Sequence, residues 1–253
     1  MAGVILAVSG KGGVGKTSIS AAIVRLLVEH HPKARILAID ADPATGLATA
    51  LGVDVVQTLD NIRVRIAESA EKGETREAVE LLGEARFQIL DALAEQGGGG
   101  SFAFLAIGRP ETAGCYCAIN SYLKEVLTLL AAEFDYVVID GEAGVEQINR
   151  RVMERVTHLL LISDQSRKGI QVLQTILEVA RRMVMYDRCG VVINRITSPN
   201  LEIRLDGIDL LACIPSDNIH AENDILGKSV FDLSPESPVL TGAETALRNF
   251  TLI

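Results

Sequence analysis

The chain has 253 residues, of which 48% are hydrophobic and only 4% aromatic, so small aliphatic side chains must fill the core, as in a parallel sheet with helices on both faces. The net charge of −9 and the pI near 5.0 argue against a surface built for nucleic acid or anionic lipid. No apolar run approaches the roughly 20 residues of a membrane helix and no signal-peptide pattern opens the sequence, so we expect a cytoplasmic protein whose cysteines are reduced or bound to metal.

Short β-rich runs alternate with longer segments of helical periodicity, which is typical of a doubly wound α/β sheet. The predicted strands are Val4–Ser9, Arg35–Asp40, Tyr136–Asp140, Thr157–Ser163, Cys189–Asn194 and Ile208–Ile214, with a weaker one near Ile62–Ala67. The predicted helices are Lys16–His30, Thr45–Leu51, Thr75–Glu95, Ser121–Phe134, Val145–Arg155, Ser166–Met185 and Gly242–Phe250. The glycine run Gly97–Gly100 indicates an inserted flexible connector, and no repeat is present, so we expect one domain over residues 1–253.

The segment that follows the first predicted strand has the spacing G-x4-G-K-T, from Gly10 to Thr17. Its glycines allow the backbone N–H groups to turn inward around phosphate oxygens, and the next helix adds partial positive charge at its N-terminus. Lys16 is expected to neutralise the β and γ phosphates, and the Thr17 hydroxyl is expected to ligate Mg²⁺. The predicted phosphate-binding residues are Gly12, Gly13, Val14, Gly15, Lys16, Thr17 and Ser18. The sequence therefore predicts a P-loop that binds a nucleotide, the alternative being a glycine-rich turn with a chance lysine.

Two predicted strands end in carboxylates at the edge where parallel sheets bind ligands. Asp40 and Asp42 follow the second strand, and a carboxylate there can orient a water or hold hydrated Mg²⁺. One of the two could only cap the next segment, and Asp40 is favoured for that role. The strand Tyr136–Asp140 has the form of a Walker B motif, so Asp140 is expected to bind Mg²⁺ through water.

Lys11 is a second lysine within the loop, which gives the motif K-G-G-x-G-K-T. With it the chain resembles the MinD/ParA/nitrogenase iron protein family of deviant Walker A ATPases. The resemblance implies a homodimer that closes on ATP, with Lys11 of each chain contacting the phosphates held by the other. It also implies that Asp42 positions the attacking water. Gly141 and Glu142 stand where relatives often carry serine and proline, which leaves the role of Glu142 open.

The same resemblance implies contacts to the base of the nucleotide. Asn194 and Arg195 follow a strand that is similar to the adenine-side strand of the family, and Pro215 lies in a loop that is similar to its second base-contacting loop. An asparagine amide offers one donor and one acceptor to an adenine edge, which fits ATP better than GTP. Either segment could instead be a simple turn at the end of a strand.

Cys115 and Cys117 form a pair that a bare P-loop protein does not need. Thiolates are soft ligands for Zn²⁺, Ni²⁺ or Cu⁺, and residues two apart in an extended segment project to the same side. Two cysteines are half of a four-ligand site, which a symmetric dimer would complete on its axis. A strained disulfide, two inert thiols and an iron–sulfur cluster shared across the dimer are the alternatives, although the cluster lacks the cysteine expected just after Asp140. Cys189 and Cys213 are expected to be buried thiols within strands.

The combination of P-loop and cysteine pair resembles the CooC family, the nickel-insertion ATPases that mature carbon monoxide dehydrogenase. This resemblance is carried by Cys115-Tyr116-Cys117 with Asn120-Ser121, by Asp140–Glu146, and by Leu226–Ser229 with Ser237-Pro238. It implies Ni²⁺, or Zn²⁺ at the same site, as the metal, and a nickel-dependent carbon monoxide dehydrogenase as client. Residues 60–109 match this family poorly.

Two rival functions belong to other classes. A positioning ATPase of the MinD or ParA kind should carry a basic membrane helix or a basic DNA-binding surface, but Thr245–Ile253 contains only one basic residue, Arg248, and the chain is acidic. An iron–sulfur reductase component would bind a cluster at the cysteines. We therefore expect neither nucleic acid nor membrane as a partner.

Overall fold

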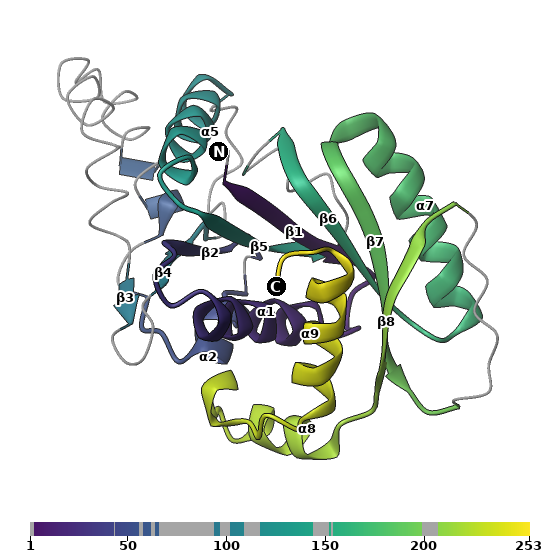
Figure 1. Ribbon diagram of the computed structural model, residues 1–253. Helices are drawn as coiled ribbons and strands as arrows, with labels where there is room; N and C mark the ends of the chain where they lie inside the picture. The colour runs from purple at the N-terminus through teal and green to yellow at the C-terminus, as the bar shows by residue number, and fades with distance from the viewer. Residues whose placement is uncertain are drawn as a thin grey trace, which may run out of the picture.

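The computed structural model describes residues 3–42, 44–55, 58–61, 64–65, 94–96, 102–108, 117–143, 152, 154–198 and 207–253. One eight-stranded sheet runs through them in the order β3-β4-β2-β5-β1-β6-β7-β8, with helices on both faces (Figure 1). The edge strand β3 (Ala94–Gln96) is antiparallel to its neighbour β4 (Phe102–Ala106), and all the other pairings are parallel. The predicted doubly wound α/β fold is confirmed.

The parallel strands follow the apolar runs of the sequence, because a strand covered on both faces meets water on neither. Besides β4 they are β1 (Val4–Gly10), β2 (Ile36–Asp40), β5 (Tyr136–Ala143), β6 (Arg155–Asp164), β7 (Met185–Ile196) and β8 (Asp209–Pro215). β1 lies in the middle of the sheet, with Val8 opposite Asp140 of β5 and Leu160 of β6. Asp40 at the end of β2 is opposite Asp140. The pairing therefore gathers the ends of these strands at one edge.

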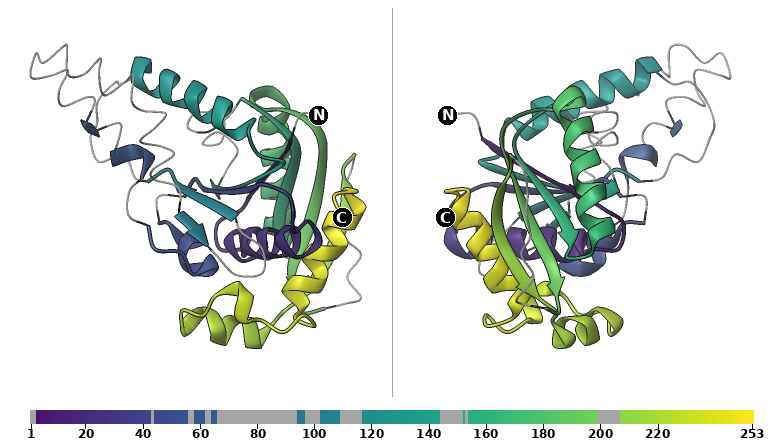
Figure 2. Two further views of the ribbon diagram at one scale, coloured as in Figure 1. Left: turned by 60° about the vertical axis from the view of Figure 1, so that its left-hand side comes forward. Right: turned by 90° about the vertical axis from the view of Figure 1, so that its right-hand side faces the viewer.

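Two layers of helices enclose two separate apolar cores. The first layer consists of α1 (Lys16–His30), α2 (Gly46–Leu51) and α9 (Pro238–Asn249), and the second of α5 (Cys117–Ala131) and α7 (Arg167–Met183) (Figures 1 and 2). Successive residues of β1 alternate between the cores, since Leu6 and Val8 pack with the first layer and Ala7 with the second. No helix in the described ranges is long and apolar enough to cross a membrane.

Several predicted elements need correction. The weak strand near Ile62–Ala67 is wrong where it is described, because residues 64–65 are helical. Most of the predicted helix Thr75–Glu95 lies outside the described residues, and its last two positions belong to β3. The predicted helix Val145–Arg155 also lies mostly outside them, and Arg155 already pairs with Met185 as the first residue of β6. In the last two cases pairing with a neighbouring strand overrides a helical pattern.

Other elements were missed or start elsewhere. The helix α8 (Asn218–Ile225) was not predicted because it buries none of its residues and so shows no apolar stripe. α5 begins at Cys117, before the predicted Ser121. Cys213 is exposed on β8, so the prediction of a buried thiol there is wrong, whereas Cys189 on β7 is half-buried.

Candidate functional site

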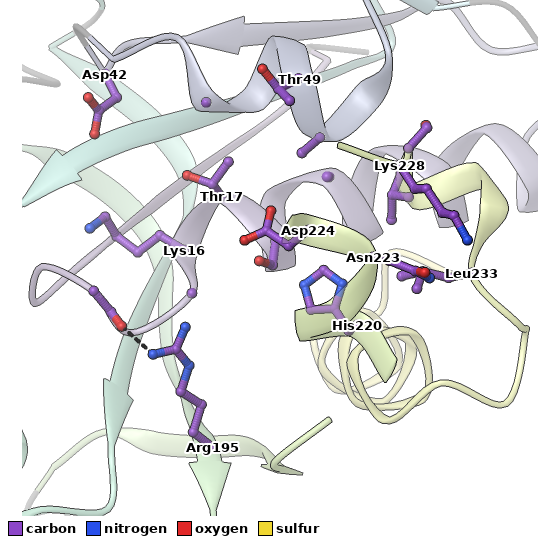
Figure 3. Close-up of a pocket in the computed structure, with 18 of the residues that line it drawn as sticks. Lys16, Thr17, Asp42, Thr49, Arg195, His220, Asn223, Asp224, Lys228 and Leu233 are labelled. Atoms are coloured by element: carbon purple, nitrogen blue, oxygen red, sulfur yellow. Dashed lines mark hydrogen bonds between the residues drawn. The ribbon is translucent and has the colours of Figure 1, made fainter. Parts of the chain in front are cut away.

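A pocket of about 530 Å³ opens at the edge of the sheet where β1 ends and α1 begins (Figure 3). The P-loop, the start of α1 and α2 form one side, and Arg195 with the segment from α8 to the 3-10 helix η1 (Val230–Asp232) forms the other. The predicted site residues that line this pocket are Gly12, Gly13, Gly15, Lys16, Thr17, Ser18, Asp42 and Arg195. The remaining loop residue, Val14, is buried. The structure therefore brings most of the predicted nucleotide-binding residues together.

The loop before α1 has the shape of an anion cradle. Gly13 and Gly15 have φ angles of +76° and +88°, which favour glycine. A Cβ atom at Gly15 would also lie 2.6 Å from Nδ2 of Asn194, so a larger residue there would have to displace that amide. Gly15 is the N-cap residue of α1, and no side chain caps the helix at that end. The first N–H groups of α1 are thus turned toward the loop, which fits a phosphate.

The predicted magnesium ligands lie next to each other. The Thr17 hydroxyl donates to Oδ2 of Asp140 over 2.8 Å, and the Ser20 hydroxyl donates to Oδ1 over 2.9 Å. Lys16 starts α1 with its side chain buried, and its Nζ donates to the Lys11 carbonyl over 3.3 Å. Thr17 and Asp140 would therefore hold Mg²⁺, a hard cation that prefers oxygen, beside the loop. Ser20 was missed by sequence reasoning, although its place one helical turn after Thr17 was a usable signal.

The two aspartates after β2 have different surroundings. Asp40 is fully buried, and its oxygens accept the backbone N–H groups of Asp42, over 3.1 Å, and Leu47, over 2.9 Å. This confirms that Asp40 caps the next segment. Asp42 instead lines the pocket, as Thr17 does (Figure 3). Its Oδ1 accepts the Ala44 N–H group over 2.9 Å. Among the described residues nothing donates a hydrogen bond to Oδ2, so this oxygen is suited to accept one from a water molecule.

Burial raises the pKa of two carboxyls, those of Asp40 at the end of β2 and of Asp140 within β5. Burial and the nearby Asp140 raise the pKa of Asp40 to about 7. Burial raises the pKa of Asp140 to about 6, although hydrogen bonds from Thr17 and Ser20 act in the opposite direction. A divalent cation would stabilise the charged forms of both groups, so the donor set fits magnesium chemistry.

This burial predicts a pH dependence of stability. As pH falls from about 8 to about 6, the free energy of unfolding of the nucleotide-free protein should gain about 1.4 kcal/mol from Asp40. The sign follows because the folded carboxyl takes up its proton near pH 7, whereas the unfolded one does so near its ordinary value of 3.8. Urea unfolding in EDTA should show this gain in the wild type and in the exposed-site control Asp54→Asn, but not in Asp40→Asn. An identical pH slope in all three proteins would contradict the prediction.

Lys11 is held within its own chain. Its Nζ donates to Oδ2 of Asp164, at the end of β6, over 2.8 Å. The two side chains are 28% and 27% exposed. The implied contact of Lys11 with the phosphates of a partner chain stays a prediction.

The residues predicted to contact the base lie in three different places. Asn194 is buried, and its Nδ2 donates to the Val14 carbonyl over 2.8 Å, so it supports the loop from β7 and is not part of the pocket wall. Arg195 lines the pocket and donates from Nη1 to the Gly13 carbonyl over 2.8 Å (Figure 3). Pro215 is exposed at the end of β8, away from the pocket wall. Contacts of Asn194, Arg195 and Pro215 to a base therefore stay predictions.

Sequence reasoning missed the wall that faces the P-loop. α8 and the segment after it contribute His220, Asn223, Asp224 and Lys228 (Figure 3). His220, Asn223 and Asp224 belong to no motif noted in the sequence. Lys228 lies in the segment Leu226–Ser229, which carries the resemblance to CooC but was given no role in nucleotide binding. Asp217 caps α8 by accepting the His220 N–H group over 2.9 Å. This cap and the preceding strand β8 determine where α8 lies relative to the P-loop. A local sequence pattern could not reveal that position.

The described residues do not include the thiol group of either Cys115 or Cys117. Cys115 lies outside the described residues, and Cys117 is described only as the first residue of α5. Because Cys117 is helical, the argument from an extended segment does not hold at that position. Among the described residues, no group of three or more His, Cys, Asp or Glu is arranged to hold a metal ion. The assignment of Cys115 and Cys117 as metal ligands stays a prediction.

Comparison with known proteins agrees with this geometry. Residues 5–230 match the family described as the CobQ/CobB/MinD/ParA nucleotide binding domain. An uncharacterized ATP-binding protein of Methanocaldococcus jannaschii is 33% identical over 95% of both chains. The carbon monoxide dehydrogenase accessory protein CooC of Rhodospirillum rubrum is 29% identical over 91% of this chain and 90% of its own.

Solved structures show the same fold. The septum site-determining protein MinD of Pyrococcus horikoshii, solved with Mg-ADP, has a TM-score of 0.69 at 21% identity and covers 99% of this chain and 96% of its own. MinD of Aquifex aeolicus has a TM-score of 0.70 at 19% identity, covering 99% and 97%. The P-loop geometry and the family match over most of the chain lead to one conclusion: this chain belongs to the CobQ/CobB/MinD/ParA family of nucleotide-binding domains.

Proposed function

We propose that this protein is an ATP-dependent metallochaperone, a single P-loop domain that works as an ATP-gated homodimer. It binds nickel, or zinc at the same site, through Cys115 and Cys117 of both chains and assists nickel insertion into a carbon monoxide dehydrogenase. One observation carries the proposal. The relative named as a carbon monoxide dehydrogenase accessory protein matches 91% of this chain, and this chain also contains the Cys115–Cys117 pair.

The nucleotide-binding part of the proposal rests on the pocket. The N–H groups at the start of α1 and the Lys16 ammonium bind and orient the phosphates. Thr17 and Asp140 hold Mg²⁺, which supplies charge neutralisation when bound. Asp42 lines the same pocket and orients the attacking water, so the protein hydrolyses ATP to ADP and phosphate. Lys11 of the partner chain adds positive charge as the γ-phosphate leaves.

The metal-binding part rests on symmetry. Each chain supplies two thiolates, and a soft divalent ion favours four such ligands. A twofold axis between two copies of the pair would complete that set. Because ATP binds more tightly to the closed dimer, nucleotide and metal binding are coupled, and hydrolysis favours release of the ion to the client.

A metal titration with cysteine variants tests this function. The double variant Cys115→Ser/Cys117→Ser should lose nickel binding, with its affinity reduced by at least about 100-fold, since a dimer of variant chains has none of the four proposed thiolates. Cys213→Ser is the matched control, because it removes an exposed thiol on β8 and should bind nickel as the wild type does. Retained binding of a fluorescent ATP analogue would show that each variant is folded.

Three outcomes would count against this function. Undiminished nickel binding in the double variant would rule out the cysteine pair as the site. Sedimentation of the ATP-bound protein with anionic vesicles or DNA would instead favour a positioning ATPase, and a brown chromophore after anaerobic purification would favour an iron–sulfur component.

A further inference from the structure

The ion pair between Lys11 and Asp164 links two neighbouring strands at the edge of the pocket. Lys11 follows β1 directly, and Asp164 is the last residue of β6. β1 and β6 are parallel neighbours, with Gly10 opposite Ile162. The 2.8 Å contact therefore ties the P-loop to the end of an adjacent strand, and its two partners are 153 positions apart in the sequence.

The carboxylate of Asp164 is held in place by contacts other than the one to Lys11. Its Oδ1 accepts the Ser166 N–H group over 3.0 Å and also the Ser166 hydroxyl. Ser166 is the N-cap of α7, and its Oγ accepts the Gly169 N–H group over 2.9 Å. A Cβ atom at Gly169 would lie 2.2 Å from Oδ1, so the glycine leaves room for this carboxylate. One oxygen is thus committed to the start of α7, and the other faces Lys11.

The charge on Asp164 is stabilised in this position. Burial alone would raise the pKa of Asp164, but hydrogen bonds from Lys11 and Ser166 bring it below its ordinary value. Lys11 therefore has an ionised, pre-positioned acceptor within its own chain at neutral pH.

We propose that Asp164 is a positioning residue that holds Lys11 in its own chain and so opposes closure of the dimer until nucleotide is bound. This inference rests on the proposed function, in which Lys11 contacts the phosphates of the partner chain. Closure then exchanges the Asp164 carboxylate for a phosphate as the partner of the ammonium group. Without nucleotide, closure would break the ion pair between Lys11 and Asp164 and form no new one. The open form is therefore favoured.

The substitution Asp164→Asn separates the two oxygens of this carboxylate. Asparagine keeps Oδ1 for Ser166 but replaces Oδ2 with an amide nitrogen, which cannot accept a hydrogen bond from Lys11. The contact is about a quarter exposed, so we expect a modest effect, a dimer dissociation constant about 2- to 5-fold lower than that of the wild type. Sedimentation velocity with Mg²⁺ and a nonhydrolysable ATP analogue over a range of protein concentrations would measure it.

Lys11→Ala provides the control for mechanism. In that background Asp164→Asn should change the dissociation constant by less than the measurement error, because no ammonium group remains to be held. A dissociation constant for Asp164→Asn that is equal to or higher than that of the wild type would overturn the proposal. The same decrease in both backgrounds would also overturn it, since Asp164 would then act through α7.

The failure of this inference can be told apart from failure of the proposed function. A wild-type protein that stays monomeric with the ATP analogue would overturn both. ATP-driven dimerisation of the wild type with no effect of Asp164→Asn would overturn only the role of Asp164. Urea unfolding of Asp164→Asn at the wild-type midpoint would show that the cap of α7 is intact.

Discussion

Replacing Lys16 with alanine is expected to weaken nucleotide binding and to lower ATP hydrolysis by about 100- to 1000-fold. Lys16 is the first residue of α1 and is only 8% exposed, so its charge acts where water screens little. Its Nζ lies 3.3 Å from the Lys11 carbonyl, which directs the ammonium group over the loop. Because neither the backbone N–H groups nor Mg²⁺ at Thr17 can replace this charge, both binding and hydrolysis should suffer.

Isothermal titration with ATP and Mg²⁺, followed by a phosphate-release assay, would measure both effects. Lys33→Ala is the matched control, because Lys33 is an exposed lysine after α1 and outside the pocket. ATP affinity for Lys16→Ala within about threefold of the wild type would show that the P-loop does not bind the phosphates as proposed.

Replacing Lys11 with alanine should give a different kinetic pattern. We expect hydrolysis to fall by about 1000-fold, the size of effect that a charge supplied by a partner chain produces in phosphoryl transfer. Nucleotide binding by the single chain should change by only a few fold, because Lys11 is paired with Asp164 and is absent from the pocket wall. ATP-driven dimerisation should be weaker than in the wild type but still measurable at high protein concentration.

The contrast between the two lysines makes this prediction specific. Steady-state kinetics at several protein concentrations would show whether the wild-type rate per chain rises with dimer formation and whether that rise is missing in Lys11→Ala. If Lys11→Ala lost nucleotide affinity as severely as Lys16→Ala, the lysine would act on the phosphates of its own chain. Its proposed role across the dimer would then be wrong.

The phosphate-binding half of the site could be predicted from sequence because its geometry is local. The left-handed turns at Gly13 and Gly15 and the helix that begins at Lys16 lie within a few residues of one another. The capping role of Asp40 is local too, since it binds the backbone of Asp42 and Leu47. In such cases the residue types alone indicate the conformation.

The rest depends on pairings that no local pattern contains. Asp164 meets Lys11 only because β6 lies beside β1. The amide of Asn194 supports the loop because β7 brings it within 2.8 Å of the Val14 carbonyl. The pocket wall on α8 has no buried residue, so hydrophobic periodicity could not indicate it. Tertiary neighbours, and not propensity, determine these features.

Metal analysis of the nickel-loaded protein, separated by size-exclusion chromatography with and without a nonhydrolysable ATP analogue, would test directly whether nucleotide completes a metal site shared by two chains. We expect about one nickel ion per two chains, eluting with a dimer that forms only when the analogue and Mg²⁺ are present. Nickel that elutes with the monomer at one ion per chain, whether or not nucleotide is present, would contradict a shared site.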